Sequence, residues 1–307
     1  MSDAFDVVEC PDRDAWLKER RSGIGASEAA AVLGASPWKT AVDLWAEKVG
    51  IVEPPEDETE WLKWGRRLEP AIVDAYMEET GRIVIRGDNP WRLLRSTKHP
   101  FLLTTLDGEI VPIDDRGPGV FEGKTAVIFK KDEWSEEPPI QYQIQNQHQL
   151  LVTRYLWGGD AVLIGGSRFL YQDFTPNPEF QDLLLKRLET FWELVVKEQP
   201  PSLDGSESAK ELLRRLYPKE QAGKIIALPP DALTWDRELL DTKESLKVLK
   251  AREDALKAKF MEALGDAERG VLPGGDGYTL KAIHKEPYTV KAQDYRELRR
   301  FAARGTK

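Results

Sequence analysis

The sequence is nearly free of cysteine, since Cys10 is the only one among 307 residues. An intramolecular disulfide needs two cysteines, and a zinc or iron–sulfur site built from cysteine needs several. Both kinds of site are therefore excluded. A lone thiol fits a protein that works in a reducing compartment.

A long hydrophobic run is also missing. Spanning a bilayer takes roughly 20 consecutive apolar residues, and no segment approaches that length. The first residues, MSDAFDVVECPDRD, are acidic, whereas a signal peptide begins with basic residues and continues with apolar ones. We expect a protein that has no membrane partner and stays in the cytoplasm.

Positive charge is in deficit, because 44 Lys and Arg face 53 Asp and Glu, which gives a net charge of -9. Proteins that coat nucleic acid nonspecifically neutralise phosphates with Lys and Arg, so this class is not expected. If DNA is the substrate, the basic residues must be concentrated locally. The segment before residue 107 holds either such a basic wall or ordinary surface charge, in Arg66, Arg67, Arg82, Arg86, Arg92, Arg95 and Lys98.

The composition indicates a folded protein with an apolar core, since 41% of the residues are hydrophobic, ten are Trp and 32% are charged. The length exceeds what one compact core usually needs. Prolines and a glycine at 200–205 (PPSLDG) mark a boundary. We therefore predict a domain at residues 1–200 and a C-terminal extension at residues 201–307.

Hydrophobic periodicity predicts the secondary structure. In the domain, it predicts helices at 14–21, 27–33, from Thr40, and at 61–80, 141–155 and 177–197, and strands at 83–85, 102–105, 109–111, 120–126, 161–165 and 169–174. In the extension, it predicts a long amphipathic helix at 235–264, a hairpin at 271–283, a strand at 288–290 and a helix at 292–301. This order predicts an α/β core with a central mixed β-sheet flanked by helices.

The segment most informative about chemistry combines an acidic residue with a Glu-Gly-Lys run. Asp107 stands at a strand–turn junction, and Glu122 and Lys124 lie on the next strand. Because side chains alternate along a strand, Glu122 and Lys124 share a face, which Asp107 can approach. Carboxylates bind Mg²⁺, and a lysine beside them orients the attacking water and offsets charge on the phosphate. The alternative is an exposed charge pattern.

Two helices carry further candidates. Glu69 lies late in the helix 61–80, either directed at the sheet as a metal ligand or paired with neighbouring arginines at the surface. Gln145, Gln147 and Gln149 repeat at every second position, so one helix face cannot collect all three. Gln145 and Gln149 share a face because they are four residues apart.

Arg21 and the turn that follows it suit an anion. The turn at 22–27 places backbone N–H groups at a helix N-terminus beside a guanidinium, an arrangement that favours phosphate. A simple N-cap by Ser27 is the alternative.

Taken in order, these motifs resemble the YqaJ-type viral recombinase family, related to the phage lambda exonuclease within the PD-(D/E)XK nuclease superfamily. The matching stretches, within residues 16–165, are RSGIGASEAAAVLG at 21–34, SPWKT at 36–40, WGRRLEPA at 64–71, LDG at 106–108, EGK at 122–124 and QNQHQLLVTR at 145–154. Each motif alone is weak, whereas all of them in family order make a strong signal. The resemblance implies a restriction-endonuclease-like core.

The resemblance also implies roles for the candidate residues. The metal and catalytic residues are Glu69, Asp107, Glu122, Gly123 through its backbone carbonyl, Lys124 and Gln145. The residues that hold the 5′-phosphate and the DNA are Arg21, Ser27 and Gln147. The implied cofactor is Mg²⁺, with two ions expected and Mn²⁺ as a substitute.

The activity that the resemblance implies is digestion of double-stranded DNA from an end, 5′ to 3′, leaving 3′ single-stranded tails for phage or prophage recombination in a bacterial host. The expected partners are double-stranded DNA ends, a single-strand annealing protein and further copies of the chain in a ring. Two alternatives stay open: an endonuclease or nickase on the same fold, and a DNA-binding or scaffolding module with a vestigial nuclease site. The extension lies outside the resemblance, and its long helix predicts a partner surface.

Overall fold

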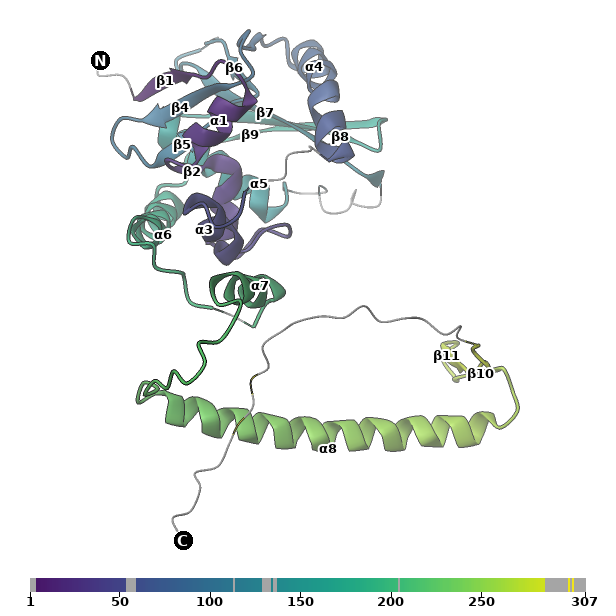
Figure 1. The fold of residues 1–307 in the computed structure, drawn as a ribbon. Coiled ribbons are helices and arrows are strands. Elements are labelled where there is room, and N and C mark those ends of the chain that lie inside the picture. Colours follow the sequence, from purple (N-terminus) through teal and green to yellow (C-terminus); the bar gives the residue numbers. More distant parts are fainter. Residues whose placement is uncertain are drawn as a thin grey trace. The chain divides into compact units, whose positions relative to one another are not determined.

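Two β-sheets and the helices around them make up the first of two units into which the chain divides (Figure 1). This computed structural model describes residues 4–53, 59–112, 114–128, 134, 137–203, 205–284, 298 and 300. The first unit covers Met1–Tyr217 and the second covers Pro218–Lys307. Within the described ranges, no helix combines the length and the apolar character that crossing a membrane requires.

A five-stranded sheet carries the Glu-Gly-Lys run. Its strand order is β3 (Val84–Ile85), β6 (Gly108–Ile110), β7 (Gly119–Ala126), β8 (Gly158–Ile164) and β9 (Arg168–Phe174). β7 and β8 pair in parallel and the other neighbours are antiparallel, so the predicted mixed sheet is confirmed. Parallel neighbours need a crossover connection, which here contains α5 (Ile140–Thr153).

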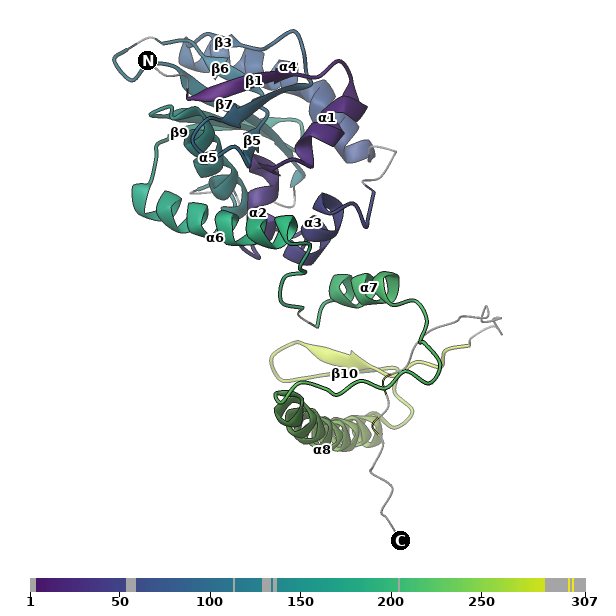
Figure 2. The ribbon, with the colours of Figure 1, turned by 60° about the vertical axis from the view of Figure 1, so that its left-hand side comes forward.

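The two faces of β7 carry different side chains because successive residues point to opposite sides. The ring of Phe121 packs against Tyr76 of α4 (Glu60–Thr80), with 4.9 Å between the ring centroids. Glu122 instead forms hydrogen bonds with side chains of α5. The sheet therefore lies between α4 on one face and α5 on the other, an arrangement that Figure 2 shows from the side.

A second, four-stranded sheet contains three strands that hydrophobic periodicity did not predict. Its order is β1 (Phe5–Glu9), β4 (Arg92–Ser96), β5 (Leu102–Thr104) and β2 (Ile24–Gly25). β1 and β4 are short, charged residues interrupt them, and their pairing joins distant parts of the chain. Because β5 belongs to this sheet and β6 to the other, Asp107 lies at the junction between the two sheets.

Helix α4 matches its prediction at both ends. The Thr59 hydroxyl accepts a hydrogen bond from the backbone N–H three residues on, and Gly81 ends the helix with a φ of 69°, a left-handed conformation that favours glycine. Along the helix, Ile72 and Tyr76 are buried, whereas Trp64 in the first half is 52% exposed. The first turns of α4 line a cavity instead of covering the sheet.

The remaining helices of the first unit pack mainly on one another and on α5, and most of them share an apolar core with residues of the smaller sheet (Figure 2). They are α1 (Arg13–Arg20), α2 (Ala29–Val32), α3 (Ala41–Lys48), α6 (Pro178–Val196) and α7 (Glu207–Leu216). The predicted helix 27–33 is interrupted, since a 3-10 turn at Ala26–Glu28 precedes the four residues of α2. Three alanines in α2 allow it to lie close to α5 and α6.

Helix α7 belongs to the first unit, so the chain divides after Tyr217 and not at the expected position 200. Ala209 and Leu212 of α7 are buried, and the helix packs against α3. The proline-rich segment at 200–203 is therefore a connection within the first unit. Breaker residues indicate where regular structure ends, but they do not indicate which core the next helix joins.

The second unit contains the long helix and the hairpin that the sequence predicts. None of the residues of α8 (Ala232–Leu264) is buried. β10 (Arg269–Val271) and β11 (Gly277–Thr279) pair antiparallel, and the rings of Phe260 and Tyr278 lie 4.0 Å apart, so the hairpin packs on the end of the helix. The strand expected at 288–290 and nearly all of the helix expected at 292–301 lie outside the described residues.

Candidate active site

Asp107 and the Glu-Gly-Lys run meet where the two sheets join. The carboxylate of Asp107 accepts a hydrogen bond of 2.9 Å from the backbone N–H of Gly123. This bond ties the segment after β5 to the middle of β7. The predicted approach of Asp107 to this strand is confirmed.

Glu122 is 2% exposed and accepts hydrogen bonds from three side chains. Lys124, on the same face of β7, is one donor. Gln145 and Gln149 donate to its two carboxylate oxygens at 2.6 and 2.5 Å. The shared helix face of the two glutamines is confirmed, and Gln149, which had no assigned role in the sequence analysis, joins the cluster.

Burial and like charge act together on Asp107. Burial, followed by the nearby carboxylate of Glu122, raises the pKa of Asp107 well above its usual range, although Lys124 opposes this effect. Burial alone would lower the pKa of Lys124, but Glu122 and Asp107 outweigh it and raise that pKa. Two carboxylates thus share a site that favours additional positive charge.

Glu69 lines the same cavity as Asp107, a cavity of about 480 Å³. Its carboxylate accepts a hydrogen bond of 2.8 Å from Arg86. Both alternatives for Glu69 therefore hold in part, because it reaches the cavity and is also paired with an arginine. The arginine comes from the segment after β3 and not from the neighbouring positions of α4.

The donor chemistry of this cluster suits a hard cation. Mg²⁺ prefers carboxylate and carbonyl oxygens, which Asp107, Glu122 and Gly123 offer. Among the described residues, no three Asp, Glu, His or Cys side chains converge as a ready set of ligands. Glu122 instead pairs with Lys124, and Glu69 pairs with Arg86. A divalent cation would offset the charge of Glu122 that, after burial, raises the pKa of Asp107.

Asp160 is a buried acid of this site that the sequence did not reveal. It pairs with Glu122 in the parallel register of β7 and β8 and is 5% exposed. Burial and the charge of Glu122 raise the pKa of Asp160 to about 7, and Asn146 donates a hydrogen bond of 2.6 Å to its carboxylate. Its segment, GGDAVLI, has the pattern of an ordinary buried strand, so only the strand register could identify it.

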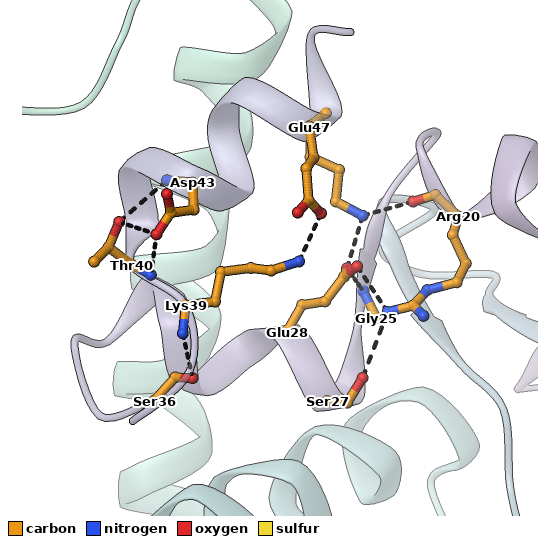
Figure 3. A network of polar contacts seen from close by, with 10 residues as sticks. Arg20, Gly25, Ser27, Glu28, Ser36, Lys39, Thr40, Asp43 and Glu47 are labelled. Atoms are coloured by element: carbon orange, nitrogen blue, oxygen red, sulfur yellow. Dashed lines mark hydrogen bonds and ion pairs between the residues drawn. The ribbon is translucent and has the colours of Figure 1, made fainter. Parts of the chain in front are cut away.

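The arginine beside Ser27 is Arg20 and not, as the sequence predicted, Arg21 (Figure 3). The Arg20 guanidinium donates to the Ser27 hydroxyl at 3.4 Å and to Glu28 at 2.7 Å. Arg21 forms an ion pair with Glu53. Successive residues of a helix point about 100° apart, so a shift of one position at the end of α1 redirects the guanidinium.

The backbone N–H groups of the turn at 22–27 are also engaged. The Ile24 N–H donates to the Phe101 carbonyl at 2.6 Å, and the Gly25 N–H donates to the Glu28 carboxylate at 2.7 Å. The expected cradle of open amides is therefore wrong at these two positions. Part of the turn has become strand β2 of the smaller sheet, so the Ile24 N–H is used beside β5, and the Glu28 side chain takes the Gly25 N–H.

A second, smaller cavity of about 60 Å³ lies beside Arg20. Its lining includes Arg20, Gly25, Ser27, Thr105 and Gln145. Gln145 connects this cavity to the carboxylates, because its side chain also donates to Glu122. A group bound by Arg20 and Ser27 would therefore lie next to the acidic cluster.

The structure does not bring Gln147 to the site. Its side chain donates to the Thr175 carbonyl and accepts from the Asn177 N–H, both at 2.9 Å, so it organises the start of α6.

His148 is a packing residue: it is fully buried, its ring lies 3.1 Å from the Leu103 carbonyl, and burial lowers its pKa to about 4.

The predicted basic cluster divides between two places. Three of its members, Arg66, Arg86 and Arg92, line the larger cavity, where Arg13, Arg20 and Arg21 join them from outside the predicted cluster. Arg82 and Arg95 instead form ion pairs with Asp173 and Glu19. Arginine is thus concentrated around the acidic cluster even though the chain as a whole is acidic.

The chain has a mixed-sheet α/β fold with buried acids around one lysine. This is the arrangement that the sequence motifs predicted. A family model described as the YqaJ-like viral recombinase domain matches residues 15–156. The uncharacterized protein YqaJ of Bacillus subtilis (strain 168) is 33% identical over 286 residues, which cover 92% of this chain and 88% of that protein. The chain belongs to the YqaJ family.

Two solved exonuclease structures are similar to part of the chain. The alkaline exonuclease LHK-Exo from Laribacter hongkongensis is 16% identical, and the match covers 66% of this chain and 98% of that chain with a TM-score of 0.49. A phage related exonuclease from Haemophilus somnus 129PT is 12% identical, and the match covers 57% of this chain and 96% of that chain with a TM-score of 0.43. At this distance, the likeness does not by itself assign an activity.

Proposed function

We propose that this protein is a Mg²⁺-dependent deoxyribonuclease that digests linear double-stranded DNA from its ends. The observation that carries the proposal is the buried Glu122, which shares a face of β7 with Lys124 and lies beside Asp107. Phosphodiester hydrolysis needs acids for a metal ion and a positive charge at the reacting phosphate. The arginine-lined cavity around the cluster fits a polyanionic substrate.

In this proposal the metal ions, two Mg²⁺ or their substitute Mn²⁺, would be held by Glu69, Asp107, Glu122 and the carbonyl of Gly123. A bound ion would activate water and stabilise negative charge on the phosphate. Lys124 lies against Glu122 and adds a fixed positive charge at the same place. Gln145 orients Glu122 through a hydrogen bond of 2.6 Å.

Arg20, in place of Arg21, binds a terminal 5′-phosphate together with Ser27 in this proposal. Both residues line the small cavity, which Gln145 connects to Glu122. A guanidinium suits this role because it can form paired hydrogen bonds with a phosphate. A strand held by its 5′-phosphate next to the acidic cluster would be digested 5′ to 3′ and would leave a 3′ single-stranded tail.

Purified protein with Mg²⁺ is expected to degrade linear duplex DNA from 5′-phosphorylated ends and to leave covalently closed circles intact. The measurement is gel analysis of three substrates, namely 5′-phosphorylated linear duplex, 5′-hydroxyl linear duplex and closed circles, with Mg²⁺, Mn²⁺ or EDTA. Either metal should support cleavage, and EDTA should stop it. Digestion of closed circles would establish an endonuclease or nickase instead, and binding without any cleavage would establish a DNA-binding module.

We further propose that the second unit mediates association. The exposed leucines along α8 include Leu239, Leu246, Leu249 and Leu256. Leucines at such spacings are typical of helices that pack against other helices. Ring formation and contact with a single-strand annealing protein would both use this unit.

A chain that ends at Tyr217 is expected to keep Mg²⁺-dependent cleavage of short duplexes and to form smaller oligomers by light scattering. A chain that ends at Pro200 also loses the buried side chains of Ala209 and Leu212, so its free energy of unfolding should be lower by roughly 2–4 kcal/mol. Denaturant unfolding of both chains measures this difference. A folded but inactive chain ending at Tyr217 would show that the second unit contributes to the active site.

A further inference from the structure

Glu28 is the centre of an ion network around Arg20 (Figure 3). One of its oxygens accepts a hydrogen bond of 2.7 Å from the Arg20 guanidinium. The other accepts hydrogen bonds of 2.7 Å from the Lys48 ammonium and from the Gly25 N–H. Lys48 also donates to the backbone carbonyl of Arg20 at 2.7 Å. Lys48 therefore holds both the backbone of Arg20 and the partner of its side chain.

The network is buried, which stability alone does not explain. The side chain of Lys48 is 3% exposed and that of Glu28 is 10% exposed. Burial alone would raise the pKa of Glu28, but Arg20 and Lys48 outweigh it and lower that pKa to about 2, so Glu28 carries its charge at neutral pH. Replacing a buried ion pair with apolar residues often stabilises a protein, so the burial of this network does not by itself indicate a stabilising role.

The residues around Arg20 restrict where its guanidinium can lie. A Cβ atom at Gly25 would lie 3.2 Å from the Arg20 Nη2 and 3.3 Å from the Glu28 Oε2. The φ of Gly25 is -76°, which any residue adopts, so glycine serves here to leave space. The guanidinium also lies over the ring of Trp16, at 4.7 Å from its centroid. The Glu28 carboxylate, the Trp16 ring and the backbone of Gly25 thus surround the Arg20 guanidinium.

We propose that Glu28 and Lys48 are positioning residues that hold the Arg20 guanidinium at the wall of the small cavity, where it meets a terminal 5′-phosphate. This inference rests on the proposed function, in which Arg20 and Ser27 bind that phosphate. Arg20 lines both the larger and the small cavity and its side chain is 22% exposed, whereas Glu28 and Lys48 line only the larger one. They act through Arg20, which is the charged residue of the network that reaches the small cavity.

A positioning role differs from a structural role in what its loss affects. A guanidinium without Glu28 moves between several rotamers, so the contact with the end phosphate weakens while contacts with the rest of the duplex remain. A structural role would weaken the binding of all DNA ends alike. The changes Arg20→Ala and Glu28→Gln should also be non-additive, because the second acts through the group that the first removes.

The test compares two short duplexes that differ only in a 5′-phosphoryl or a 5′-hydroxyl end. Binding to the full chain is measured by fluorescence anisotropy in EDTA, so cleavage is not needed. The unaltered protein is expected to bind the phosphorylated duplex at least about tenfold more tightly. Glu28→Gln and Lys48→Met are each expected to reduce this ratio at least about threefold, mainly through weaker binding of the phosphorylated duplex.

Two matched controls remove a charge close by. Arg21→Ala changes the neighbouring arginine, and Glu47→Gln changes a carboxylate that pairs with Lys39 at 2.6 Å. Both are expected to keep the ratio of the unaltered protein. If Glu28→Gln fails to fold, Glu28→Asp is the milder variant, because it keeps the charge but is too short to reach Arg20, and it should also lower the ratio.

A folded Glu28→Gln protein with an unchanged ratio would overturn the proposal, and so would an equal loss of affinity for both duplexes. Equal affinity of the unaltered protein for the two ends would overturn it as well, together with end recognition by Arg20. The nuclease proposal is judged separately, by cleavage in Mg²⁺. The failure of one proposal is therefore distinguishable from the failure of the other.

Discussion

Asp107→Asn is expected to reduce DNA cleavage in Mg²⁺ at least about a thousandfold, because it removes an anionic oxygen from the proposed metal site. The same change is expected to stabilise the metal-free protein at neutral pH. Burial and the charge of Glu122 raise the pKa of Asp107, so folding disfavours its ionised form. Asp107 therefore lowers the stability of the unaltered chain as the pH rises from the pKa of the unfolded state through the raised pKa, and the variant lacks this contribution.

The measurements are cleavage rates in Mg²⁺ and thermal unfolding in EDTA across a pH series. Mg²⁺ should raise the unfolding midpoint of the unaltered protein but not that of Asp107→Asn. Asp114→Asn is the matched control, since Asp114 is an exposed carboxylate that pairs with Arg116. A cleavage rate of Asp107→Asn close to that of the control would contradict the assignment.

Glu122→Gln is expected to abolish cleavage as well, but with the opposite effect on stability. Its carboxylate accepts hydrogen bonds from Lys124, Gln145 and Gln149, and an amide offers only one oxygen to these donors. A buried donor without an acceptor costs about 1–3 kcal/mol. Opposite shifts in the free energy of unfolding would show that the charge of Asp107 destabilises the metal-free site, whereas Glu122 stabilises it by accepting hydrogen bonds from its neighbours.

Lys124→Met is expected to reduce the cleavage rate at least about a hundredfold, which is typical when a preorganised charge is removed from a reacting centre. Its ammonium donates to Glu122 and lies 5.3 Å from the centroid of the Tyr142 ring, so contacts on two sides hold it. Although burial opposes the effect, Glu122 and Asp107 raise the pKa of Lys124, which keeps the side chain cationic at neutral pH.

Single-turnover cleavage at saturating protein measures the chemical step for this variant. Lys98→Met is the control, because Lys98 is an exposed lysine of the predicted basic cluster. Lys124→Arg keeps the charge but changes its shape, so an intermediate rate is expected. A loss confined to KM, with kcat unchanged, would assign Lys124 to DNA binding instead of chemistry.

Local sequence patterns were sufficient to predict which residues of the acidic cluster share a face of a strand or a helix. Side-chain alternation along a strand placed Glu122 and Lys124 on one face, and their hydrogen bond shows that they share it. The four-residue spacing of Gln145 and Gln149 placed them on one helix face, and both donate to Glu122. These relations depend only on the repeat of a strand or a helix, which a short segment sets by itself.

Other features depend on which segments meet, and no short segment contains that information. Asp160 neighbours Glu122 only because β7 and β8 pair in a particular register. Strand β1 forms only because β4, far along the chain, offers it a partner. Helix α7 joins the first unit because Leu212 finds an apolar surface there, although the composition at 200–205 indicates a boundary before it.

Arg20 and Arg21 show most clearly what the sequence determines and what only the tertiary structure decides. The sequence sufficed to indicate an arginine and Ser27 around a turn, because the residue types and the approximate spacing carry that information. It did not indicate which arginine faces the serine, since adjacent side chains at the end of a helix point about 100° apart. Packing made that choice: Lys48 and Glu28 hold Arg20 inward, and Glu53 holds Arg21 in an exposed ion pair.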